Sequence, residues 1–138
     1  MNPTSFAFIG YILWMMLLVF LILGLRIYQF LFAGHPVNTF KPDGSDVSDF
    51  SQRLCRAHAN CIEGFPIFGG LLLFALISGL TTVTNGLAAF LLLARVCQST
   101  IHLISTRSIA VHLRFTCLMV QLIISAIWGY QFLMIHLS

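Results

Sequence analysis

Apolar residues recur in four long runs along the chain, each long enough to cross a membrane as a helix. The first run has Arg26 as its one charged residue and no basic residue before it, so a retained span is expected rather than a signal peptide. About 20 apolar residues span a hydrocarbon core of about 30 Å. We therefore predict an all-α fold, a transmembrane four-helix up-and-down bundle that forms a single domain over residues 1–138. The predicted spans cover residues 6–32, 50–80, 86–104 and 109–137.

Polar and helix-breaking residues mark the ends of these spans. The sequence Lys41-Pro42-Asp43-Gly44 predicts a turn in the first loop. Ser48-Asp49 is typical of a helix start. Pro66 is expected to kink the second helix, since neighbouring helices can satisfy the carbonyl that it frees. Further breaks are predicted at residues 79–86 and 105–108.

Charge is scarce and unevenly placed. The chain has eleven charged residues, and none lies in residues 1–25, 64–94 or 115–138. A soluble domain of this size needs more charge to cover its surface, and a net charge of +3 over apolar segments does not suit nucleic acid. All seven basic residues belong to the end that holds the first and third loops. The positive-inside rule then places these loops in the cytoplasm and both termini outside, in a bacterial inner membrane or the endoplasmic reticulum.

Polar residues within the second span fall on one face. Arg53, Arg56, Asn60 and Glu63 are spaced by three or four residues, which places them within about 80° on a helix. Ionisable groups inside membrane helices are costly and indicate function. Glu63 lies about three helical turns from the start of this helix, so we expect it to pair with Arg56 or Arg95. His58 lies well off this face and is expected to be a packing or tuning residue.

The other spans bring polar groups to the same membrane end. Arg95, Ser99 and His102 share a face of the third span, and Arg26 and Arg114 come from the first and fourth. The alternative for Arg26, Arg107 and Arg114 is that they are interfacial anchors. A haem held by His102 and His112 is a further alternative. The motifs of serine hydrolases, metalloproteases and nucleotide-binding proteins are absent from the sequence.

The string Arg53-Leu54-Cys55-Arg56-Ala57-His58-Ala59-Asn60-Cys61-Ile62-Glu63-Gly64-Phe65-Pro66 resembles the signature of the MAPEG family, the membrane-associated proteins in eicosanoid and glutathione metabolism. The four spans and Arg95 agree with that family in order and spacing. The resemblance implies a homotrimer that binds glutathione near the cytoplasmic face, in a cleft between subunits. The cofactor-binding residues that it implies are Arg26, Arg53, Arg56, His58, Asn60, Glu63, Arg95 and His102.

The resemblance also implies that an arginine at the start of the fourth helix stabilises the glutathione thiolate. Arg114 matches best, and Arg107 is the rival. Three departures from the family pattern stand out: His102 replaces a frequent tyrosine, Ala59 replaces a basic residue, and Pro36-Val37-Asn38-Thr39 replaces a basic cluster. Each removes a contact that some members use for glutathione. The alternatives are therefore that glutathione is held more weakly, that a different low-molecular-weight thiol is bound, or that no thiol is bound.

The function expected from these features is a membrane-bound glutathione-dependent transferase or peroxidase. Its substrates would be hydrophobic electrophiles or lipid hydroperoxides that enter from the bilayer. The first alternative is a non-catalytic member that binds lipid or a partner protein in the same cleft. The second is an unrelated four-span scaffold or transporter, although paired broken helices typical of transporters are not seen in the sequence.

Overall fold

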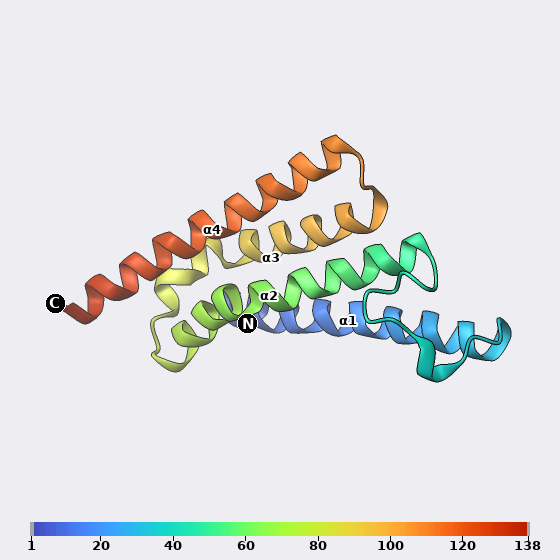
Figure 1. Ribbon diagram of the computed structural model, residues 1–138. Coiled ribbons are helices and arrows are strands. Elements are labelled where there is room, and N and C mark those ends of the chain that lie inside the picture. The colour runs from blue at the N-terminus through green and yellow to red at the C-terminus, as the bar shows by residue number, and fades with distance from the viewer. Residues whose placement is uncertain (1, 138) are drawn as a thin grey trace.

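Four long helices make up the computed structural model, which describes residues 2–137. They are α1 (Pro3–Phe32), α2 (Asp49–Ile77), α3 (Thr81–Ile104) and α4 (Ser108–Leu137), with a short 3₁₀ turn η1 (Val37–Thr39) in the first loop. The helices run up and down, so both termini lie at one end with the α2–α3 turn, and the other two loops lie at the opposite end (Figure 1). All four helices have the length and apolar composition of membrane spans. The predicted all-α transmembrane four-helix bundle is therefore confirmed, and the protein is an integral, multi-pass membrane protein.

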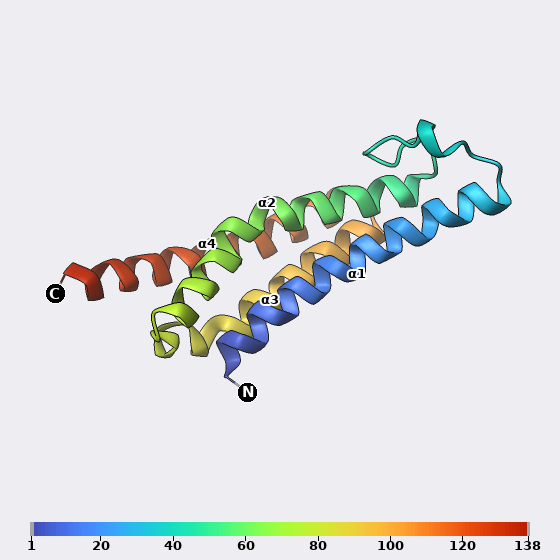
Figure 2. The ribbon, with the colours of Figure 1, turned by 90° about the horizontal axis from the view of Figure 1, so that it is seen from below.

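Helices α2 and α3 form the middle of the bundle. Each contacts the other, α1 packs against both of them, and α4 packs mainly on α3. Figure 1 shows the order α4, α3, α2, α1, and Figure 2 shows the bundle turned by 90°. Because α4 has little contact with α2, the space between these two helices is left partly open to form a site.

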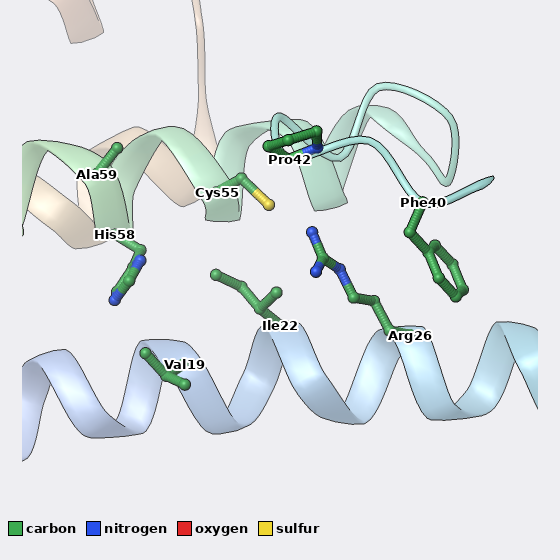
Figure 3. A pocket seen from close by; sticks show the side chains of 8 residues that line it. All are labelled: Val19, Ile22, Arg26, Phe40, Pro42, Cys55, His58 and Ala59. Atoms are coloured by element: carbon green, nitrogen blue, oxygen red, sulfur yellow. The ribbon is translucent and has the colours of Figure 1, made fainter. Parts of the chain in front are cut away.

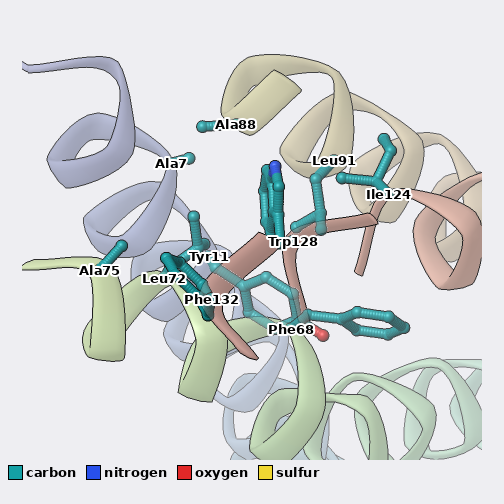
Figure 4. Packing of buried hydrophobic residues seen from close by; sticks show 10 residues of the cluster. All are labelled: Ala7, Tyr11, Phe68, Leu72, Ala75, Ala88, Leu91, Ile124, Trp128 and Phe132. Carbon is teal, nitrogen blue, oxygen red and sulfur yellow. The ribbon is translucent and has the colours of Figure 1, made fainter. Parts of the chain in front are cut away.

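The packed core lies in the half of the bundle nearer the termini. Trp128 from α4, Tyr11 from α1 and Phe68 from α2 are almost completely buried there, with Leu91 of α3 against them (Figure 4). Aromatic side chains bury large apolar areas, so this cluster fixes the four helices relative to one another. The opposite half, near the α1–α2 and α3–α4 loops, has a smaller buried cluster and holds the candidate site residues.

Helix α3 begins at Thr81, which corrects the prediction that residues 79–86 form a turn. The polar residues that suggested a turn are used instead in contacts between helices. Thr4 Oγ1 lies 2.7 Å from Thr84 Oγ1 and donates to Asn85 Oδ1 at 2.8 Å. These hydrogen bonds fasten the first turn of α1 to the first turns of α3. The turn itself is shorter, with Gly79 at a φ of 72°, a conformation that favours glycine after a helix end.

The first loop and the start of α2 follow the sequence prediction closely. Gly44 N donates to Lys41 O at 3.1 Å, which closes the predicted turn. Ser48 caps α2, since its side chain accepts from Ser51 N at 3.0 Å. Gly44 has a φ of 70°, and a Cβ there would meet the Ser51 backbone at 2.9 Å. Glycine is therefore required at this position for two reasons, the positive φ and the close approach of the loop to α2.

Helix α2 continues through Pro66, as predicted. Proline has no N–H and crowds the preceding turn, which bends a helix. Figure 2 shows the second half of α2 turned away from the direction of its first half. The bend separates the polar half of α2, which carries the candidate site, from the half that packs into the core.

Candidate functional site

The predicted site residues lie on two different sides of α2. Asn60 and Glu63 face the space between α2, α3 and α4. His58 faces α1, as its position on the helix predicts. The structure therefore separates the predicted residues into two groups, each in the half of the bundle nearer the α1–α2 and α3–α4 loops.

The first group surrounds a hollow of about 230 Å³ between α2, α3 and α4. Its polar lining consists of Asn60, Gln98, His102 and Arg114, and apolar residues of α4 complete it. Arg107, the rival to Arg114, lies exposed before α4 and does not line this hollow. The structure thus brings Arg114, His102 and Asn60 together.

Arg95 is the most deeply placed charge in the described part of the chain. Its side chain is 0% exposed, and its Nη1 donates to Asn60 Oδ1 at 2.8 Å. Its Cζ lies 5.0 Å from the centre of the Phe68 ring and 5.5 Å from that of Tyr11. Cation–π contacts of this kind hold a guanidinium in place. Its Nε and Nη2 have no hydrogen-bond partner within residues 2–137, so two buried donors remain available.

Glu63 and Arg95 line a second cavity of about 260 Å³, which continues toward the core along Ile67, Phe68 and Leu122. The expected ion pair of Glu63 with Arg56 or Arg95 does not form. Within residues 2–137 the ion pair that the structure contains is His35–Asp46, at 3.1 Å. The Glu63 side chain is exposed on the surface of the protomer, and Arg95 uses Asn60 in its place. Carboxylates within membrane helices almost always face the bundle interior or a water-filled cavity, and Glu63 lines the cavity that Arg95 also lines.

A pair of glutamines joins α3 to α4 beside the first hollow. Gln121 Nε2 donates to Gln98 Oε1 at 2.9 Å and to Cys117 O at 2.8 Å. Both side chains are buried, with Gln98 5% and Gln121 0% exposed. Sequence reasoning missed both residues. Gln98 could have been found, since it follows Arg95 by three positions and thus shares its helix face; Gln121 carries no such signal in an apolar span.

The second group lies around a cavity of about 400 Å³ between α1 and α2. Arg26 points from α1 toward Cys55 and Pro42, and His58 points from α2 toward α1 (Figure 3). Arg26 Nη2 donates to Lys41 O at 3.2 Å, and its Cζ lies 5.7 Å from the centre of the Phe40 ring. The first loop therefore covers this cavity and holds Arg26 in it.

Arg53 and Arg56 differ in their surroundings although both belong to the motif. Arg53 Nε donates to Leu103 O at 2.9 Å, so Arg53 holds the end of α3 against α2. Arg56 is exposed and makes no hydrogen bond to the rest of the described chain. Of the two, Arg56 is the one whose guanidinium is free to bind a ligand.

The three cavities are lined in part by residues of the α2 motif, namely His58, Asn60 and Glu63. Neither a search of curated proteins nor a search of solved structures gives a significant match to the chain. A scan against protein-family models matches residues 4–134 to the MAPEG family. This match covers all four helices, and the protein therefore belongs to the MAPEG family.

Proposed function

We propose that the protein is a membrane-bound glutathione-dependent transferase or peroxidase that acts on hydrophobic electrophiles or lipid hydroperoxides. Family membership supports a role in membrane glutathione or eicosanoid metabolism in coarse terms. The observation that carries the finer proposal is the hollow between α2, α3 and α4, where Arg114, His102 and Asn60 meet inside membrane helices. Polar side chains at this depth are expensive unless a ligand uses them.

The charges around the hollow fit glutathione, which has two carboxylates, one ammonium and one thiol. Arg56 and Arg114 are cations without an acidic partner in the described chain, and arginine binds carboxylates through paired hydrogen bonds. Glu63 is an unpaired carboxylate that suits the ammonium. Arg95 has two buried donors without partners, which suit a further ligand oxygen. The residues present therefore match each charged group of the peptide.

Arg114 is proposed to favour the thiolate form of the bound thiol, because a guanidinium stabilises a neighbouring anion. The thiol proton passes to water at the mouth of the site. The sulfur then forms a bond to an electrophilic carbon, and a halide leaves or an epoxide C–O bond opens. The oxygen of an opened epoxide takes a proton from water. With a lipid hydroperoxide, two glutathione molecules supply the two electrons, and the products are an alcohol, water and the disulfide.

The arrangement also supports the proposed homotrimer. Glu63 and Arg56 are exposed on the protomer, and charges of this kind are not stable against lipid. Arg26 and His58 line a separate cavity on the α1 side of α2. If one subunit places its α1–α2 side against the α2–α4 side of the next, the two groups form one site. We propose that the end with the α1–α2 and α3–α4 loops is cytoplasmic, since the basic residues gather at that end, and that both termini lie outside.

The test uses the purified protein in detergent with added glutathione. Thiolate formation is measured as absorbance near 240 nm, and conjugation is measured with a chlorodinitrobenzene substrate. Wild type and Arg107→Ala should give the thiolate signal, and Arg114→Ala should lose it. Glu63→Gln and Arg56→Ala should weaken glutathione binding. Absence of both thiolate and conjugation in the wild-type protein would contradict an enzymatic function.

A second candidate is a non-catalytic lipid- or partner-binding protein. Its support is Ala59, which lines the cavity between α1 and α2. A basic side chain is common at this position in the MAPEG family. Glutathione would then have one fewer cation. Binding of a fluorescent fatty acid that glutathione neither displaces nor strengthens, with no conjugation, would favour this candidate.

A further inference from the structure

The amide groups around the hollow are oriented by partners inside the protein. The carbonyl oxygen of Cys117 can only accept, so the Gln121 atom that contacts it at 2.8 Å is the nitrogen. The same nitrogen contacts Gln98 at 2.9 Å. The Gln98 atom in that contact is therefore the oxygen, and its amide nitrogen faces the other way. This assignment depends on hydrogen-bond chemistry rather than on the shape of the side chains.

Asn60 is oriented by the same reasoning. A guanidinium can only donate, and Arg95 Nη1 lies 2.8 Å from the Asn60 side chain. The contacting Asn60 atom is therefore the oxygen, and the two N–H bonds of its amide nitrogen are left for other partners. Both Asn60 and Gln98 line the hollow. The oxygens of two amides are thus used inside the bundle, while their nitrogens remain as donors.

The hollow consequently lacks a fixed acceptor among its polar side chains, apart from the imidazole of His102. Its polar lining consists of two amides with engaged oxygens, His102 and the Arg114 guanidinium, and no carboxylate is among the residues that line it. Donors that are held in place before a charge develops stabilise an anion without reorganisation. An arginine alone would attract any anion, whereas amide donors whose oxygens are already engaged restrict where in the hollow an anion can bind.

We propose that Gln98 and Asn60, together with Arg114, form an anion hole that holds the thiolate sulfur, with Gln121 as the positioning residue that orients Gln98. This inference rests on the proposed glutathione-dependent function and names the group that the hollow binds. Gln98 is a catalytic residue in this proposal because its amide N–H contacts the reacting atom. Gln121 acts only through Gln98.

The deciding substitution is Gln98→Glu. A carboxylate at this position still accepts from Gln121 and has the same size, so the contact between α3 and α4 is kept. Toward the hollow it replaces an N–H donor with an oxygen that repels a thiolate. Gln131→Glu is the matched control, since it adds the same charge at an exposed position near the carboxyl end of α4, where Gln131 lines none of the three cavities described above.

Two measurements separate binding from ionisation. S-methylglutathione binding, which needs no thiolate, is measured by calorimetry, and the thiolate of bound glutathione is measured at 240 nm. We expect Gln98→Glu to lower the thiolate fraction at pH 7 about tenfold while S-methylglutathione affinity changes less than threefold. Gln131→Glu should match the wild type. Gln121→Met should lower the thiolate fraction and kcat, with KM for glutathione unchanged.

Three outcomes count against the inference. An unchanged thiolate fraction in Gln98→Glu overturns it and leaves the proposed function intact. An equal loss of S-methylglutathione binding and thiolate would show that Gln98 binds the peptide part rather than the sulfur. If the wild type binds neither ligand, the proposed function fails and the inference fails with it. If Gln98→Glu does not assemble, Gln98→Met removes the donor without adding charge and is measured in the same way.

Discussion

A single methyl group at position 64 tests how firmly Arg95 is held. A Cβ built on Gly64 lies 2.6 Å from Arg95 Nη2 and 2.8 Å from Phe68 Cε2. Both distances are well below van der Waals contact, and both side chains are buried within the core. Arg95 cannot move aside without losing its hydrogen bond to Asn60. Gly64→Ala therefore forces either the guanidinium or the Phe68 ring out of position.

The magnitude follows from two opposing effects. Replacing glycine by alanine inside a helix gains about 1 kcal/mol, and overpacking a core costs about 1–3 kcal/mol. Gly70 lies on the same helix with nothing within 4 Å of its Cβ position, so Gly70→Ala shows the gain alone. We expect the Gly64→Ala protein to be less stable than the Gly70→Ala protein by about 1–3 kcal/mol.

The assay is reversible unfolding in mixed micelles, followed by helix circular dichroism as sodium dodecyl sulfate is added. Glutathione binding is measured on the same samples. Equal stability of the two variants would show that Arg95 and Phe68 relax freely, and the description of Arg95 as a fixed donor for Asn60 would then be wrong.

Three further substitutions probe other contacts. Thr4→Val should lower the free energy of unfolding by about 1–2 kcal/mol in the same assay. Its effect should not add to that of Thr84→Val, because the two side chains share a hydrogen bond. Additive effects in the double variant would contradict the contact. Arg53→Met should speed amide exchange at the end of α3 while glutathione affinity falls less than in Arg56→Ala, and a larger fall would assign Arg53 to the ligand. The backbone N–H and hydroxyl of Ser45 hold the pKa of the Asp43 carboxyl below its usual value, so its contribution to the turn is present above the usual pKa of aspartate and is lost as the pH falls through the lowered value. Proteolysis of the first loop should accelerate over that acidic range in the wild type and not in Asp43→Asn; equal profiles would refute this.

Much of the fold could be predicted because its determinants are local. The apolar runs, the Ser48 cap and the turn at Gly44 each depend on residues near one another in the chain, and the structure confirms them. The start of α3 could not be predicted in this way. Thr84 and Asn85 resemble turn residues until Thr4, which is far away in sequence, provides their partners.

The site shows the same division. Helical spacing alone predicted that Asn60 and Glu63 share a face and that His58 points elsewhere. It could not predict which polar group Arg95 contacts, since Glu63 and Asn60 are both within one turn on α2. The choice of Asn60 depends on the distance between α2 and α3, which Gly64 and the Phe68 ring set. The role of Gln121 depends on a contact across two helices and has no counterpart in the sequence pattern.

The hydrogen bonds of Thr4 have a consequence for how the chain is built into the membrane. Helix α1 emerges first during synthesis, but the partners of its first turn lie on α3. In a nascent chain that ends after α2, Thr4 in the first turn of α1 therefore lacks its hydrogen-bond partners Thr84 and Asn85. Docking of that end must wait until α3 has entered the bilayer. The hydrogen bonds that join α1 to α3 at the end with the termini can therefore form before α4 is made, because none of their partners lies on α4.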